Sequence, residues 1–350
     1  MARLQVEQVN QIDTSVECPD ASSKMAALSQ HVLSALRRIG VDTWTAVAIW
    51  VLVLGVALAC GGHLRFTAST MWAPLLAALL GMTACAATRR PFWHGLAEWG
   101  PFILILSLYM QIDPYTRLIQ PQPVDAKLAA IDTALFGGVP SELLAPYRSP
   151  WLTELMAAGY SCYLVLMFCV APAYIPTVAD PAPRMRYRQA FRATQTALVL
   201  ELGLGFFLYM LVPARGPRYF FPDAAPLHGA LGYYDWAIAG WNAMQACHHD
   251  AFPSLHTATG VVSILFSLRL RRLFRPLPYL ISVPAIVLIL STVYLRMHYV
   301  VDVFAGILHG LFSAWLGQYL VVRFHGPDVP DGVSPSSASD PSQDAHAVTP

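Results

Sequence analysis

The feature that most constrains this chain is a series of apolar segments, each long enough to form a membrane-spanning helix. A helix crosses a bilayer with about twenty mostly apolar residues. Such segments occupy residues 43–61, 70–88, 97–115, 151–176, 193–212, 253–270, 277–295 and 300–322. The composition agrees, because 56% of the residues are hydrophobic and only 12% are charged, against about 25% charged in a typical soluble domain. We therefore expect an all-α fold, a polytopic integral membrane helix bundle with about eight transmembrane helices.

The distribution of cations predicts how this bundle is oriented. Alternate connections, all of them short, carry most of the arginines. These are Arg37, Arg38, Arg89, Arg90, Arg184, Arg186, Arg188, Arg192, Arg269, Arg271, Arg272, Arg275 and Arg323. Because cations in short loops remain on the cytoplasmic side, we expect both termini to be cytoplasmic. Topology and contact with anionic headgroups explain these arginines, so they give no support to a nucleic-acid partner.

The first candidate motif is Phe252-Pro253-Ser254-Leu255-His256, at the extracytoplasmic end of an apolar segment. Proline is well tolerated in the first turn of a helix, so a helix is predicted to begin here. Its free backbone N–H groups form an anion site, to which the Ser254 hydroxyl adds a donor. His256 would lie over this anion. The alternative is a histidine that only forms a structural hydrogen bond at a helix end.

The second motif is His298-Tyr299-Val300-Val301-Asp302, expected at the same membrane face. Four residues separate His298 from Asp302, so the two are predicted to share a helix face. The carboxylate would accept a proton from one ring nitrogen and leave the other free. A histidine held in this way is a competent nucleophile toward phosphorus. The alternative is a buried polar pair that joins the last helix to its neighbours.

Three arginines are expected near these histidines: Arg215 and Arg218, in the sequence Arg-Gly-Pro-Arg, and Arg296. A guanidinium matches the oxygens of phosphate, and phosphoryl transfer depends mainly on positioning and charge stabilisation. We therefore predict that Arg215, Arg218, Ser254 and Arg296 bind a substrate phosphate. No metal and no organic cofactor is required, because the arginines and the helix end supply positive charge.

Two other classes of site use the same residue types. A metal site could draw on His248, His249, Asp250, His256, His298 and Asp302, although no short spacing among them matches a familiar zinc motif. A lipid or proton transporter also places histidine and aspartate within the membrane. Such a transporter should show an internal hydropathy repeat, and we find none in this sequence.

From about Asp132 to Gly306, the chain resembles the type-2 phosphatidic acid phosphatase superfamily. The resemblance rests on the Pro-Ser-x-His sequence that ends at His256, the His-x-x-x-Asp sequence from His298 to Asp302, and the basic motif around Arg215. The inositol phosphorylceramide synthase branch is the most similar, since Asp132, Leu135-Phe136-Gly137 and Pro140 also resemble it. Two departures from the common phosphatase pattern lean toward this branch. The basic motif reads Arg-Gly-Pro-Arg, and Thr292 stands in place of an arginine six residues before His298.

The resemblance implies that His298 is the nucleophile, Asp302 its orienting partner, and His256 the general acid that protonates the leaving alkoxide. The expected function is transfer of a phospho-headgroup from a phospholipid donor to a lipid hydroxyl through a phosphohistidine. The alternatives are a lipid phosphate phosphatase that uses the same site and a lipid transporter. Membrane lipids are the expected partners, and nothing in the sequence indicates an oligomeric state.

These expectations divide the chain into five parts. They are a cytoplasmic N-terminal segment with a short amphipathic helix (1–42), accessory transmembrane helices (43–115), an outer-face amphipathic connection (116–150), a catalytic transmembrane core (151–325) and a disordered cytoplasmic tail (326–350). In the connection, Val124, Leu128, Ile131 and Leu135 recur at helical spacing before Gly137. We expect this helix either to pack over the bundle or to guide a lipid tail.

The predicted orientation can be tested with two introduced cysteines. A cysteine at Ala225 should react with a membrane-impermeant maleimide added outside, and a cysteine at Gly326 should react only from the cytoplasmic side. Labelling of both positions from outside would contradict the orientation and the placement of the two histidine motifs.

Overall fold

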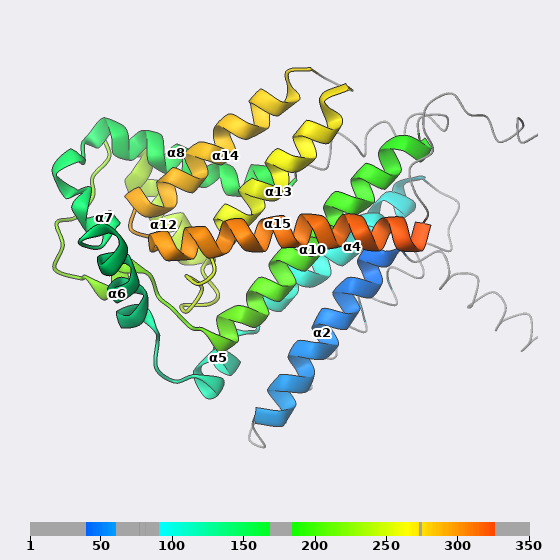
Figure 1. The fold of residues 1–350 in the computed structure, drawn as a ribbon, viewed down its shortest axis with the longest axis horizontal. Coiled ribbons are helices and arrows are strands. Elements are labelled where there is room, and N and C mark those ends of the chain that lie inside the picture. Colours follow the sequence, from blue (N-terminus) through cyan, green and yellow to red (C-terminus); the bar gives the residue numbers. More distant parts are fainter. Residues whose placement is uncertain are drawn as a thin grey trace, which may run out of the picture. The chain divides into compact units, whose positions relative to one another are not determined.

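The structure is a computed structural model that describes residues 40–60, 77, 81, 91–168, 184–272 and 275–325. Within these ranges every regular element is a helix, and the single β-bridge joins Ala214 to Asp250 (Figure 1). The all-α fold is therefore confirmed for the described part of the chain. The predicted segment 70–88, apart from residues 77 and 81, lies outside these ranges, as do residues 1–39 with the expected amphipathic helix and the tail 326–350.

The long helices overlap the other predicted apolar segments. They are α2 (Val41–Cys60), α4 (Pro91–Tyr109), α8 (Pro150–Met167), α10 (Arg184–Leu211), α13 (Leu255–Arg269), α14 (Leu277–Tyr294) and α15 (Val300–His325). The shorter helices lie in the connections. They are α5 (Asp113–Ile119), α6 (Asp125–Phe136), α7 (Pro140–Leu143), η1 (Ala145–Tyr147), α11 (Pro217–Phe220), α12 (Tyr233–Met244) and η2 (Leu270–Arg272).

Three of the described helices are long and apolar enough to cross a membrane: Gln189–Leu211, Leu277–Tyr294 and Val300–Phe324. Two shorter apolar helices run over Val41–Val56 and Glu98–Tyr109. The outward faces of α14 and α15 expose large apolar side chains, as expected where lipid tails replace water. These helices indicate a membrane protein, while the number of eight spans stays a prediction.

Helix α10 is the centre of the bundle and contacts α2, α4, α5, α13 and α15. Near its start, Arg192 forms an ion pair with Asp42 of α2, with 3.0 Å between Nη1 and Oδ1, and both side chains are buried. A buried charge needs such a partner. Arg192 therefore ties helices together, whereas the sequence pattern suggested a cation that meets lipid headgroups.

Two glycines on one face of α15 bring this helix against α13. A Cβ atom at Gly306 would lie 2.4 Å from the carbonyl oxygen of Ser254, and one at Gly310 would lie 2.8 Å from that of Ala258. Small residues four apart allow the backbones of membrane helices to approach closely. The start of α13 is thereby held beside the first turn of α15, where the Ser254 N–H donates to the Asp302 carbonyl at 3.1 Å.

Helix α6 forms where the spacing predicted a helix, and Gly137 ends it with a left-handed φ of 77°. Only part of the apolar stripe packs against the protein, since Leu128 is buried while Ile131 and Leu135 are exposed. The face that packs inward instead carries two acids, Asp125 and Asp132. Both acids accept hydrogen bonds from loops at the site described below.

The close approach of α15 to α13 makes a prediction about stability. Gly310→Val should lower the free energy of unfolding by about 1–3 kcal/mol, because the added side chain overpacks the interface. Thermal unfolding of the purified protein in detergent measures the change. Gly55→Val is the matched control, because a Cβ at Gly55 meets nothing within 4 Å. An equal loss in both variants would place the cost in the helix backbone and not in the α13–α15 contact.

Candidate active site

A cavity of about 300 Å³ lies among α4, α8, α10, α12 and the start of α13. Much of its lining is apolar or aromatic, as in Leu106, Phe206 and Trp241. The polar part of the lining contains both candidate histidines, two arginines, a glutamine and an acid: His256, His298, Arg215, Arg218, Gln245 and Asp250. The structure therefore gathers most of the predicted site residues around one space.

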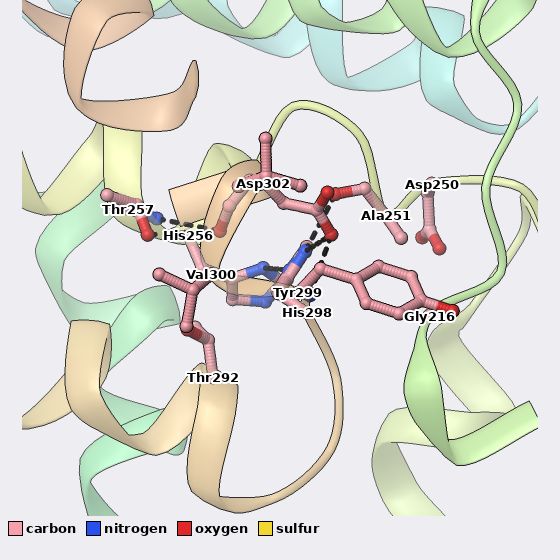
Figure 2. A network of polar contacts seen from close by, with 12 residues as sticks. Gly216, Asp250, Ala251, His256, Thr257, Thr292, His298, Tyr299, Val300 and Asp302 are labelled. Atoms are coloured by element: carbon pink, nitrogen blue, oxygen red, sulfur yellow. Dashed lines mark hydrogen bonds and ion pairs between the residues drawn. The ribbon is translucent and has the colours of Figure 1, made fainter. Parts of the chain in front are cut away.

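His298 lies in the turn between α14 and α15, where its N–H donates to the Thr292 carbonyl at 3.1 Å. Its Nδ1 is 2.7 Å from the Ala251 carbonyl oxygen and 3.6 Å from Oδ2 of Asp302 (Figure 2). Because a carbonyl only accepts hydrogen bonds, Nδ1 carries the proton. Nε2 is then unprotonated and carries the lone pair of the ring. The nearest acceptor is thus a backbone carbonyl, and the expected carboxylate lies slightly further away.

Asp302 is fully buried behind His298 on the first turn of α15. Its Oδ2 accepts from the Tyr299 N–H at 2.9 Å, and within the described part of the chain Oδ1 has no hydrogen-bond partner. The carboxylate therefore caps the helix and also faces the imidazole.

His256 sits in the first turn of α13 with its ring enclosed by two tyrosines. The ring stacks on Tyr160 at 4.5 Å between centroids and lies 4.1 Å from the ring of Tyr163. Its Nδ1 is 3.4 Å from Nε2 of His298. The free nitrogen of His298 therefore points at His256, and Figure 2 shows the two rings in this arrangement.

Ser254 does not line the cavity. Helix α13 begins at Leu255, and Ser254 is its N-cap, with an oxygen that accepts from the Thr257 N–H at 3.3 Å and from the Thr257 hydroxyl at 3.1 Å. Pro253 precedes the cap, so the helix starts two residues later than the proline suggested. Capping by serine satisfies a backbone donor that would otherwise lack a partner, and this is the contact that the Ser254 oxygen makes.

Arg215 and Arg218 both line the cavity. The Arg218 guanidinium donates to the hydroxyl of Tyr219 at 2.6 Å and to Oε1 of Gln245 at 2.9 Å. Both guanidinium groups also lie over the Tyr219 ring, at 5.1 and 4.4 Å from its centroid. In the described ranges neither forms an ion pair with a carboxylate, so their charge is available to an anion in the cavity.

The backbone of the basic motif around Arg215 is joined to the turn that carries His298. Gly216 has a φ of 87°, and a Cβ there would lie 2.2 Å from the Met297 carbonyl oxygen. The Arg218 N–H donates to the Arg296 carbonyl at 2.8 Å. Glycine is required at this contact because of its conformation and of the close approach. The segment that carries the arginines is therefore joined directly to the turn that carries His298.

Arg296 is not among the residues that line the cavity. Its Nε donates to Oε1 of Glu142 at 2.7 Å and its Nη2 to the Phe221 carbonyl at 2.5 Å. Its own φ of 63° turns the chain after α14. The side chain is buried in these contacts. It therefore occupies a structural position outside the cavity lining.

Asp125 holds the basic motif around Arg215 in place, a role that its position in the sequence did not suggest. The carboxylate accepts from the N–H groups of Arg215 at 3.0 Å and Gly216 at 2.9 Å, and from the Tyr299 hydroxyl at 3.1 Å. The side chain is almost fully buried. It thus links α6 both to the basic motif around Arg215 and to the motif from His298 to Asp302.

Asp132 plays the matching role for the turn after His298, since it accepts from the N–H groups of Val300 at 2.9 Å and Val301 at 3.0 Å. Burial raises the pKa of Asp132, and these two hydrogen bonds oppose that shift. Asp125 and Asp132 are seven residues apart, which places them on one face of a helix. That spacing was the signal in the sequence.

Asp250 is the acid that lines the cavity within the described part of the chain. Its Oδ2 accepts from the Tyr109 hydroxyl at 2.7 Å, and its Oδ1 accepts from Nε2 of Gln245 at 2.9 Å. Burial raises the pKa of Asp250, while both donors oppose the shift. Asp250 is close in sequence to the Pro-Ser-x-His motif, and the bridge to Ala214 brings it beside the basic motif around Arg215.

The candidate metal ligands do not assemble. In the described ranges no group of three or more His, Cys, Asp or Glu side chains is arranged to hold a metal ion. His249 instead pairs with Asp113, at 3.2 Å from Nδ1 to Oδ1. The imidazole of His298 is committed to Ala251 through Nδ1, as described above.

The comparisons with known proteins agree with this geometry at the level of a family. A family model described as the PAP2 superfamily matches residues 126–316, more than half of the chain. No curated protein and no solved structure matches the sequence. The matched region begins in α6, includes both histidine motifs and most of the residues that line the cavity, and ends in α15. On this match the chain belongs to the PAP2 superfamily, and its function is of the lipid phosphatase or phosphotransferase type.

Proposed function

We propose that this protein is a phosphotransferase that moves a phospho-headgroup from a phospholipid to the hydroxyl of a lipid acceptor, through a phosphohistidine at His298. The observation that carries the proposal is the hydrogen bond from Nδ1 to Ala251, 2.7 Å long. It leaves Nε2 as the free nitrogen, facing His256 in the cavity. A neutral imidazole nitrogen held in this way is a nucleophile.

In the first step, Nε2 of His298 attacks phosphorus and the bond from phosphorus to the diacylglycerol oxygen breaks. His256 gives a proton to that oxygen, and Asp302 stabilises the positive charge on His298. In the second step, the acceptor hydroxyl gives its proton to His256 and attacks phosphorus, which releases His298. General acid and base catalysis by one group in successive steps follows from the symmetry of the two transfers.

The cations and the cavity support this assignment. Arg215 and Arg218 carry unpaired charge beside the histidines, and charge stabilisation is the main requirement of phosphoryl transfer. The apolar lining suits a lipid substrate. The preference for a lipid acceptor over water rests on the resemblance to the inositol phosphorylceramide synthases. The second candidate function is a lipid phosphate phosphatase, in which water hydrolyses the same phosphohistidine.

Product analysis tests the function and the role of each histidine. Purified protein in detergent, given a phospholipid labelled in its headgroup phosphate and either ceramide or diacylglycerol, should form a labelled lipid product. His298→Ala should abolish both this product and any acid-labile phosphoenzyme. His256→Ala should lose turnover of the phospholipid but keep much of the first step on a nitrophenyl phosphoester, because a stable phenolate departs with little protonation. Release of label only to water would make the protein a phosphatase, and unchanged turnover in His298→Ala would contradict the phosphohistidine.

The positions of two arginines predict opposite consequences of their loss. Arg218→Ala should cost about 2–4 kcal/mol of transition-state stabilisation, as loss of one charge-stabilising donor does. Arg296→Ala should lower the unfolding temperature, because it removes the bonds to Glu142 and Phe221. Its effect on kcat/KM should be smaller than that of Arg218→Ala. Measuring kcat/KM and the unfolding temperature of both variants separates the two effects. A turnover defect in folded Arg296→Ala as large as that in Arg218→Ala would bring Arg296 back to the phosphate.

A further inference from the structure

The charges that line the cavity are unequal in number. Arg215 and Arg218 contribute two positive charges, and Asp250 contributes one negative charge when it is ionised. In the described part of the chain no ion pair joins the arginines to Asp250 or to another carboxylate. The histidines aside, the two arginines and Asp250 therefore give the cavity a surplus of one positive charge toward an incoming anion.

The carboxylate of Asp250 is held in place by two neutral donors. Tyr109 donates from α4 at 2.7 Å, and Gln245 donates from the loop after α12 at 2.9 Å. The same Gln245 accepts from Arg218 at 2.9 Å through its other amide atom, so the acid and the cation are connected by one side chain. Hydrogen bonds to a carboxylate favour its ionised form. Figure 2 shows Asp250 in the same close-up as His298.

From this arrangement we propose that Asp250 determines specificity by charge, selecting phosphodiesters over phosphomonoesters. A diester carries one negative charge and balances the surplus of the cavity. A monoester dianion brings a second negative charge, which faces the carboxylate of Asp250. The inference rests on the proposed function, because it concerns which phosphoester reaches His298.

The size of the effect follows from electrostatics. Two unit charges up to about 10 Å apart near a protein surface change an equilibrium on the order of tenfold or more. Removal of the Asp250 charge should therefore favour a dianion over a monoanion by about tenfold. A residue that only positions the loop would change both substrates by the same factor.

The experiment compares two soluble substrates that share a leaving group, nitrophenyl phosphate and a nitrophenyl phosphodiester, on the full-length protein in detergent. In Asp250→Asn the ratio of kcat/KM for monoester to that for diester should rise about tenfold. Asp250→Glu, which keeps the charge, should retain the ratio of the unaltered protein. Asp235→Asn is the matched control, because it removes an exposed acid of α12 that does not line the cavity. It should leave the ratio unchanged.

Inhibition by inorganic phosphate gives a second readout. It should become about tenfold stronger in Asp250→Asn relative to inhibition by dimethyl phosphate, which carries one charge. If Asp250→Asn does not fold, Asp250→Ser supplies another neutral side chain for both measurements. An unchanged ratio in a folded, active neutral variant would overturn the charge filter and leave the phosphotransferase intact. Absence of turnover on any phosphoester by the unaltered protein would instead contradict the proposed function.

Discussion

The hydrogen bond between His298 and the Ala251 carbonyl is the interaction on which the rest of the site depends. It is 2.7 Å long and decides which ring nitrogen carries the proton. Ala251 is itself held by its N–H, which donates to the Ala214 carbonyl at 2.9 Å, beside the basic motif around Arg215. Ala251 therefore connects His298, the loop before α13 and the segment that carries the arginines. A shift in any of these would change the direction of Nε2.

The backbone around this contact is irregular, so its polar groups need partners other than those of a helix. Two acids of α6 supply them. Asp125 accepts from the N–H groups of Arg215 and Gly216 in the basic motif, and Asp132 accepts from those at the start of α15. Placing two carboxylates under exposed amides also aligns loops that are far apart in sequence. The connection that contains α6 is thus part of the candidate active site, which neither of its two expected roles described.

The environment of His256 has a different origin. Tyr160 and Tyr163 of α8 enclose its ring, and the close packing of α15 on α13 sets the level at which it meets His298. Gly306 allows this packing directly below the N-cap of α13. Small residues in the apolar helices therefore fix the distance between His256 and His298, because backbones that approach closely leave little freedom for either helix to slide.

Local patterns in the sequence were sufficient for the helices and for the two histidine motifs, because apolar length and the four-residue spacing from His298 to Asp302 are properties of neighbouring residues. They also placed Arg215 and Arg218 near the site. They were not sufficient for Arg296, whose guanidinium is taken by Glu142 and Phe221, or for Ser254, which became a helix cap. A side chain with several possible partners binds those that the fold brings within reach, and Glu142 is distant in sequence. Tertiary structure alone decided that Ala251 orients the His298 ring, that Asp125 and Asp132 support the basic motif around Arg215 and the start of α15, and that Asp250 faces the same cavity. Each of these contacts joins segments that only folding brings together.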